Sequence, residues 1–263
     1  MNIKVYSIAF IIALSSLLGC GGGGGGSESG ACSALSNASR IAGGDSCYEG
    51  QANVAVVFAE SAAGEASCTG SYISRTAILT AAHCFLGRPT QVTVASSGGI
   101  REGAQYIIHP AFNGAPGSPF DMAIVKVNEP IPGGPLPLLL STDPNIGDEV
   151  VAYGYGLDQN GRQFIERIEA NEAPLKATYS TYAGYRSGVV TILSSGSGSP
   201  CPGDSGGPVV ARNVNGDYGI IGITIAGPNG CSAQVGRPVA LASVKSRGAI
   251  DFISTHVPDA AVN

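Results

Sequence analysis

The nine residues from Pro200 to Pro208 place one serine, Ser205, among glycines and prolines. A hydroxyl in such a loop has little steric cover, and the backbone N–H groups around it can point at one small volume. A serine hydroxyl is a poor nucleophile at neutral pH, so it needs a base within hydrogen-bond reach, and that base needs an orienting acceptor. The stretch therefore indicates nucleophilic chemistry if the chain also supplies an imidazole and a carboxylate.

Two segments ahead of the serine supply these groups. His83 ends the run Thr-Ala-Ala-His, and Asp121 opens the apolar run Asp-Met-Ala-Ile-Val. The other histidines, His109 before a proline and His256 near the end of the chain, are more simply explained as structural or solvent-exposed. The chain order histidine, aspartate, serine separates one lineage of serine hydrolases from the nucleophile-elbow and subtilisin types.

The elements that must position these residues are short. From Ile41 onward, apolar runs alternate with clusters of Gly, Pro, Ser and Asn. This texture predicts an all-β domain with many short strands. The exception is the end of the chain, where Ile250, Ile253 and Val257 recur at helical spacing and predict one amphipathic helix over residues 247–257.

Composition narrows the function classes. The chain has 263 residues, 44% hydrophobic and 13% charged, which suffices for one large or two small domains with a sizeable core. The net charge is −5, and acidic and basic residues are well mixed along the chain. Without a basic patch we expect no nucleic-acid partner. Three scattered histidines give no metal-ligand spacing, and we expect neither a metal nor another cofactor.

The first residues predict export. A basic start and a short apolar run make residues 1–19 a signal peptide, which is too short for a confident membrane span. The end of this run, Leu17 to Cys20, resembles a bacterial lipoprotein box, in which the cysteine is lipidated. Residues 20–40, with the glycine run from Gly21 to Gly26, then form a flexible tether or propeptide. We expect anchoring to a bacterial membrane, periplasmic or at the cell surface; the alternative is an ordinary signal and secretion.

Cysteine counting agrees with the anchored alternative. The chain has seven cysteines, and acylation of Cys20 leaves an even number for disulfides in an oxidising compartment. The sequence alone leaves their connectivity open. The six are Cys32, Cys47, Cys68, Cys84, Cys201 and Cys231.

Taken together, these motifs resemble the chymotrypsin/trypsin family of serine peptidases. The resemblance runs from Ile41 to the C-terminal helix. It is carried by Ile41 to Gly44, Cys68 to Ile73, Thr80 to Cys84, His109-Pro110, Phe120 to Val127, Tyr153 to Gly156 and Pro200 to Pro208. It implies one peptidase domain over residues 41–263, built from two six-stranded antiparallel β-barrels that divide near residues 130–145, with a C-terminal α-helix and a cleft between the barrels.

The resemblance also implies a role for each matching residue. Ser205 attacks the substrate carbonyl, His83 is the general base and acid, and Asp121 orients the imidazole. The backbone N–H groups of Gly203 and Ser205 form the oxyanion hole. The implied function is a monomeric serine endopeptidase that cleaves polypeptides through an acyl-enzyme. The alternative is an inactive, peptidase-like binding lipoprotein.

Activation is implied by the residue before the serine. In the family this acid pairs with the α-amino group released by a cut, here Asp204 with Ile41 after cleavage following Arg40. Loss of one partner of such a buried pair costs about 3–5 kcal/mol. We therefore expect a zymogen that needs a separate activating protease.

The family also suggests cysteine pairings. It pairs Cys68 with Cys84 and Cys201 with Cys231, next to the histidine and the serine respectively. A bridge between Cys32 and Cys47 is our own hypothesis; it would keep the cleaved enzyme attached to its tether.

Specificity follows from three positions. The resemblance puts Ser199 at the floor of the primary pocket, Gly227 on one wall and Val239 on the other. These residues imply small or medium apolar side chains rather than Lys or Arg.

Two departures weaken docking and efficiency. Ile225 replaces a serine that normally contacts the catalytic aspartate; Thr224 takes this place if the register shifts. Ala226 replaces an aromatic residue.

Overall fold

The structure is a computed structural model of the chain and describes residues 45–47, 53–96, 99–130, 134–157, 175–194, 199–227 and 235–263. The predicted signal peptide and tether lie outside the described residues, together with Cys20, Cys32, Arg40 and Ile41. Cys231 lies outside them as well.

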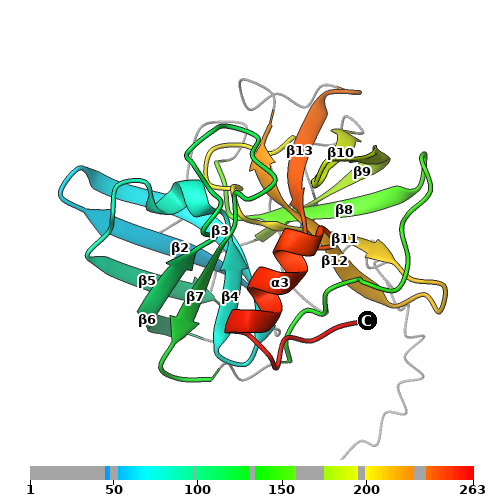
Figure 1. Cartoon of the computed structure of the whole chain (residues 1–263). Helices are drawn as coiled ribbons and strands as arrows, with labels where there is room; N and C mark the ends of the chain where they lie inside the picture. Colours follow the sequence, from blue (N-terminus) through cyan, green and yellow to red (C-terminus); the bar gives the residue numbers. More distant parts are fainter. Residues whose placement is uncertain are drawn as a thin grey trace, which may run out of the picture.

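The first half of the described chain forms a closed barrel. Its strands are β2 (Val54–Ser61), β3 (Gly64–Ser74), β4 (Ala77–Thr80), β5 (Gln91–Ser96), β6 (Gly99–Ile108) and β7 (Ala123–Val127). They are hydrogen-bonded in the order β2-β3-β4-β7-β6-β5, each antiparallel to its neighbours, and β5 returns to β2 (Figure 1). Closure leaves this sheet without an unpaired edge.

The second half forms a second barrel. Its strands are β8 (Glu149–Gly154), β9 (Leu175–Arg186), β10 (Val189–Ser194), β11 (Pro208–Arg212), β12 (Tyr218–Ala226) and β13 (Pro238–Ser243). The order β9-β10-β13-β12-β11-β8 closes through an antiparallel β8–β9 pairing, and the short strand β1 (Asp45–Cys47) adds to β9. Two six-stranded antiparallel barrels are the predicted fold, which is thus confirmed.

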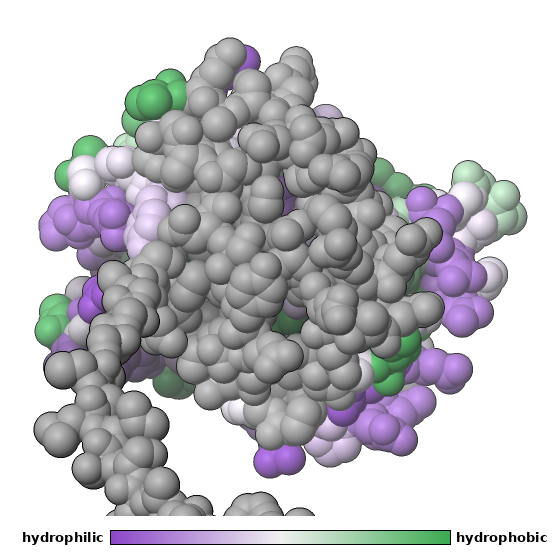
Figure 2. Space-filling view, turned by 180° about the vertical axis from the view of Figure 1, so that it is seen from behind, coloured by the Kyte–Doolittle hydropathy of each residue, from purple (hydrophilic) through white to green (hydrophobic). Residues whose placement is uncertain are grey.

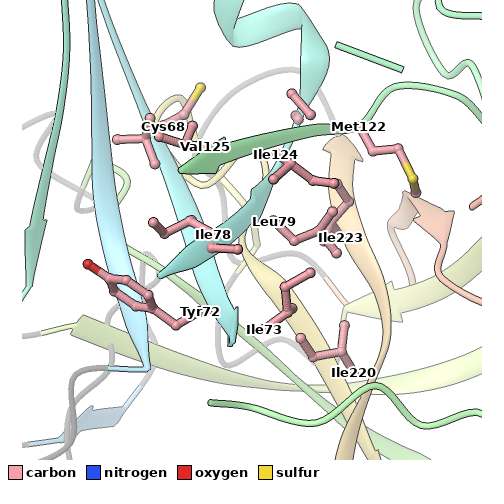
Figure 3. Close-up of a cluster of buried hydrophobic side chains, with 14 of the residues drawn as sticks. Cys68, Tyr72, Ile73, Ile78, Leu79, Met122, Ile124, Val125, Ile220 and Ile223 are labelled. Carbon is pink, nitrogen blue, oxygen red and sulfur yellow. The ribbon is translucent and has the colours of Figure 1, made fainter. Parts of the chain in front are cut away.

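A continuous apolar seam joins the barrels. A β-bulge at Ile221 interrupts the alternation of β12, so Ile220 and Ile223 both pack in the cluster shared with the first barrel while Ile221 packs inside its own barrel. Figure 3 shows Ile220 and Ile223 beside Ile73 and Leu79 of the first barrel; all four are fully buried. Burial of each such side chain is worth about 1.5–3 kcal/mol, so the seam holds the barrels in one arrangement.

One helix packs on this seam. Helix α3 (Arg247–His256) begins at the N-cap Ser246, whose hydroxyl accepts a hydrogen bond from the backbone N–H of Ala249 at 3.2 Å (Figure 1). The helix ends one residue before the predicted boundary. Ile250, expected on its apolar face, is 38% exposed, whereas Phe252 and Ile253 are buried in the seam cluster.

The described surface carries no large apolar face. Its exposed large apolar side chains come from different elements: Leu86, Ile100, Ile146, Tyr185, Val214, Val235, Ile250 and Val262. Figure 2 shows such green residues separated by purple polar ones around the edge of the rear face. Single apolar residues of this kind are normal on a globular domain.

Among the described residues, no helix combines the length and the apolar character that crossing a bilayer requires.

Candidate active site

Strand pairing brings His83 and Asp121 together. The 3₁₀ helix η1 (Ala82–Phe85) follows β4 and carries His83, while Asp121 precedes β7. Because β4 and β7 are antiparallel, with Thr80 opposite Ala123, the end of one strand lies beside the start of the other. Side chains from segments almost forty residues apart therefore meet at one edge of the first barrel.

Asp121 holds the histidine twice. Its Oδ2 lies 2.8 Å from His83 Nδ1, and its Oδ1 accepts the backbone N–H of His83 at 2.9 Å. The carboxylate is 2% exposed, whereas the imidazole is 30% exposed. Because a carboxylate only accepts, the proton of a neutral His83 sits on Nδ1 and leaves Nε2 as a base.

Asp204 anchors the serine loop, the loop that bears Ser205, through hydrogen bonds of its buried carboxylate. This side chain is fully buried; its Oδ1 accepts the N–H of Gly156 at 2.8 Å and its Oδ2 that of Cys201 at 2.7 Å. A Cβ at Gly154 or Gly156 would overlap the Asp204 carboxylate, so both positions require glycine. The predicted α-amino partner of Asp204 belongs to Ile41, outside the described residues.

The two expected oxyanion donors lie on a constrained backbone. Gly203 has φ +97°, in the region that favours glycine. The carbonyl of Pro202 accepts the N–H of Leu157 at 2.9 Å. Because the C=O and N–H of a trans peptide point in opposite directions, this bond turns the Gly203 N–H away from Leu157. The Ser205 carbonyl is held by the N–H of Thr69 at 2.8 Å.

The residue after the serine packs against the strand that leads to the histidine. Gly206 has φ +82°, and a Cβ there would overlap Thr80 Oγ1, the Thr69 carbonyl and the Ala81 N–H. Ala81 is two residues from His83, so Ser205 lies beside the histidine segment. No hydrogen bond joins Ser205 Oγ to His83 among the described residues, and in substrate-free enzymes this contact is often long until substrate binds.

A disulfide joins Cys68 and Cys84, the pair that the resemblance implies. It connects β3 to η1, directly beside His83. Cys201 and Cys47 lie within the described residues, but their predicted partners Cys231 and Cys32 do not. The other two bridges therefore stay predictions.

Two of the three specificity residues lie near each other. Ser199 is fully buried, and its hydroxyl has no hydrogen-bond partner among the residues that the structure describes. A Cβ placed on Gly227 would lie 3.1 Å from the carbonyl oxygen of Pro200, the residue that follows Ser199. Gly227 thus lies against the segment of Ser199 and Pro200.

Val239 lies elsewhere. It is fully buried in the cluster inside the second barrel, with Ile192 and Leu241, whereas its neighbour Ala240 packs on the seam side. Successive strand residues point to opposite faces of the sheet. If the family alignment is shifted by one residue, a side chain expected on the pocket wall lies instead in the barrel core. Its position gives no support to the narrowing role expected of Val239.

Ile225 and Ala226, the two departures from the family pattern, lie at the end of β12. Ile225 is buried in the seam and Ala226 is exposed. The backbone of Thr224 is hydrogen-bonded to the loop that bears Ser205: its carbonyl accepts the Gly206 N–H and its N–H donates to the Gly207 carbonyl. Within the described chain, the hydrogen bonds to the Asp121 carboxylate come from His83 alone.

Thr69 is a contact residue that sequence reasoning did not single out. Its hydroxyl donates to the Gly203 carbonyl at 2.7 Å and accepts the Tyr155 N–H at 2.9 Å. The only signal in the sequence is a hydroxyl residue directly after Cys68.

Comparison with known proteins agrees with this architecture. The Trypsin family model matches residues 41–246. A trypsin from Saccharopolyspora erythraea is 27% identical over 198 residues, covering 69% of this chain and 83% of the relative. A brachyurin from Leptuca pugilator is 31% identical over 192 residues, covering 63% and 78% respectively. The serine protease SP24D of Anopheles gambiae is 28% identical over 191 residues, 66% of this chain and 68% of the relative. With two closed barrels, an aspartate-held histidine and a family match over most of its length, the chain belongs to the trypsin family.

Proposed function

We propose that this protein is a serine endopeptidase with His83, Asp121 and Ser205 as its catalytic residues. The proposal rests on the two hydrogen bonds between the buried Asp121 carboxylate and His83. They join Oδ2 to the ring Nδ1 at 2.8 Å and Oδ1 to the backbone N–H at 2.9 Å. A pair of this kind gives the imidazole one tautomer and one orientation, with Nε2 available to a serine hydroxyl. Membership of the trypsin family supports a polypeptide as substrate.

The proposed reaction has two halves. Ser205 Oγ attacks the peptide carbonyl carbon while its proton passes to His83 Nε2, and the N–H groups of Gly203 and Ser205 receive the oxyanion. His83 then gives the proton to the leaving amine, and the C–N bond breaks to leave an acyl-enzyme. Water repeats the sequence: it loses a proton to His83, attacks the ester carbon, and Ser205 leaves with the proton returned.

The alternative is a peptidase-like binding lipoprotein without catalysis. Taking a carboxylate out of water is costly, and its hydrogen bonds to His83 largely offset that cost rather than add to stability. A buried carboxylate that orients an imidazole is useful to a catalyst but not to a binding protein. The retained pair therefore favours the enzyme.

We further propose that the chain is exported, lipidated at Cys20 and made as a zymogen cut after Arg40. The freed α-amino group of Ile41 would reach the Asp204 carboxylate, which accepts the N–H groups of Gly156 and Cys201. A Cys32–Cys47 bridge would keep the cut domain on its tether. Ser199 supplies no charge at the pocket floor, so we expect cleavage after uncharged side chains and hence a different protease for activation.

The test is active-site labelling. The activated protein is expected to react with a fluorophosphonate probe and to cleave a peptide library, whereas Ser205→Ala abolishes both. Ser254→Ala, an exposed hydroxyl on α3, serves as a matched control with full labelling. An activated, folded protein that neither labels nor cleaves would contradict the proposed function.

Activation is tested separately. Arg40→Ala is expected to leave the chain uncut and unlabelled. Near-full peptidase activity in this variant, with mass spectrometry showing an intact chain, would exclude the zymogen step while leaving the catalytic assignment in place.

A further inference from the structure

Thr69 lies where three segments of the proposed site meet. It is fully buried in β3, next to the disulfide-bonded Cys68. Its backbone N–H donates to the Ser205 carbonyl at 2.8 Å, and its carbonyl accepts the Thr80 hydroxyl at 2.7 Å. The backbone of Thr69 thus connects the serine loop with the strand that leads to His83.

The hydroxyl of Thr69 makes a second connection. It donates to the Gly203 carbonyl at 2.7 Å and accepts the N–H of Tyr155 at 2.9 Å. Gly203 belongs to the serine loop, whereas Tyr155 follows β8. One hydroxyl from the first barrel therefore links two segments of the second barrel by direct hydrogen bonds.

These bonds act on the peptides that flank the expected oxyanion donor. The Gly203 carbonyl belongs to the peptide before Asp204, and the Ser205 carbonyl belongs to the peptide after Ser205. Thr69 holds both, through its hydroxyl and its N–H. The peptide between them carries the N–H of Ser205, so its orientation is set from both ends.

The same segment braces the other donor. Leu157, two residues after Tyr155, donates to the Pro202 carbonyl at 2.9 Å and thereby orients the peptide that carries the Gly203 N–H. Gly156, between them, donates to Asp204. Three consecutive N–H groups thus serve the serine loop, and the first of them does so only through the Thr69 hydroxyl.

We propose that Thr69 is a positioning residue for the oxyanion hole: its hydroxyl fixes the Gly203 peptide against the segment of residues 155–157, so that both backbone donors are preorganised. This inference rests on the proposed peptidase function. Without the hydroxyl, the Gly203 carbonyl and the Tyr155 N–H are left inside the protein without this partner, and unpaired buried groups rotate or admit water. Oxyanion stabilisation depends on donors that are in place before the reaction, and misplacement by about 1 Å costs about 100-fold in rate.

The test compares near-isosteric variants of the activated enzyme. Thr69→Val replaces only the hydroxyl by a methyl group; we expect kcat on a peptide substrate to fall about 10- to 100-fold, with KM within about threefold. Thr69→Ser keeps the hydroxyl and is expected to retain kcat within about threefold. Fluorophosphonate labelling, which also builds negative charge on an oxygen, is expected to slow in parallel with kcat.

Matched controls separate positioning from stability. Ser243→Ala removes another buried strand hydroxyl, one that accepts the Lys245 N–H at 3.1 Å in β13; it is expected to lower Tm without changing kcat. If Thr69→Val does not fold, Thr69→Ser and Thr69→Ala form a second pair that differs only in the hydroxyl.

The outcomes are distinct. An active wild type whose Thr69→Val variant keeps its kcat, or changes KM alone, overturns the positioning role. An equal loss of kcat in Thr69→Ser overturns it as well, because the hydroxyl is then not the cause. An inactive wild type instead overturns the peptidase function, and the positioning role with it.

Discussion

Within the described chain, Asp121 is the only side chain that is hydrogen-bonded to His83. Its two carboxylate oxygens accept the ring N–H and the backbone N–H of the same residue, and among the described residues neither the Thr224 hydroxyl nor the apolar Ile225 adds a third bond. The orientation of the imidazole therefore depends on a single side chain. Substitution of this residue should be more damaging than its distance from the substrate suggests.

At the residue scale we predict the effect of Asp121→Asn. The amide has one accepting oxygen and cannot accept at its nitrogen, so His83 loses the tautomer that leaves Nε2 as a base. We expect kcat to fall about 10⁴-fold with little change in Tm. Steady-state kinetics on a peptide substrate measure this. Asp143→Asn, which removes an exposed partner of Lys245, is the control with unchanged kcat; equal kinetics in both variants would contradict the orienting role.

The serine loop is an element held by packing as much as by hydrogen bonds. Gly206 leaves room for β3 and β4 to approach the loop, because any Cβ would overlap atoms of Thr69, Thr80 and Ala81. Gly206 thus sets by packing the close approach of the loop to the histidine segment, beside the hydrogen bonds that Thr69 makes to Gly203 and Ser205.

At the element scale we predict that Gly206→Ala destroys the site. The left-handed φ costs about 1–2 kcal/mol for alanine and overpacking about 1–3 kcal/mol more. Because the overlap pushes the loop away from β4, labelling of Ser205 is expected to fall at least about 100-fold. Gly216→Ala is a matched control: Gly216 has φ +90° but nothing within 4 Å of its Cβ. We expect that variant to show only the loss in Tm, and full labelling of Gly206→Ala would refute the packing argument.

The sequence predicted features carried by short stretches of chain better than features that depend on strand register or on contacts between distant segments. Strand texture and helical spacing predicted the all-β domain and the terminal helix, whereas the two barrels and the grouping of His83 with Asp121 were predicted from the family resemblance. The expected role of Val239 depends on register, because a shift of one residue exchanges the two faces of a strand; its place inside the second barrel gives that role no support. Thr69 was missed because its partner Gly203 is 134 residues away, a contact that only tertiary packing creates.

His109 shows how the whole molecule responds to pH. It is buried between Phe120 and Phe252 of α3; its Nε2 lies 3.2 Å from the Gly248 carbonyl, and its Nδ1 accepts the Ala111 N–H. Burial lowers the pKa of His109 below its ordinary value near 6.5, against a smaller raising effect of the Gly248 carbonyl. The fold therefore prefers the neutral ring.

At the scale of the whole molecule we predict a loss of stability in mild acid. Because the pKa is lower in the folded chain, the unfolded chain binds the proton first as the pH falls. The stability is fully present above about pH 6.5 and declines as the pH falls through the window below it. Urea unfolding between about pH 5 and about pH 8 measures this. His109→Gln should flatten the decline, whereas Ile253→Val should lower stability without flattening it; an unchanged slope in His109→Gln would refute the assignment.

The seam between the barrels has a consequence for how this protein, if it acts as proposed, can change during evolution. His83 and Asp121 belong to one barrel and Ser205 to the other, so the spacing between base and nucleophile depends on how Ile73 and Leu79 meet Ile220 and Ile223. We expect a methyl group gained or lost there to shift one barrel against the other while the histidine–aspartate pair, which lies within one barrel, stays intact. Selection for turnover can therefore act on side chains that never meet a peptide, and variants from such a selection should be sought in this seam as well as in the cleft.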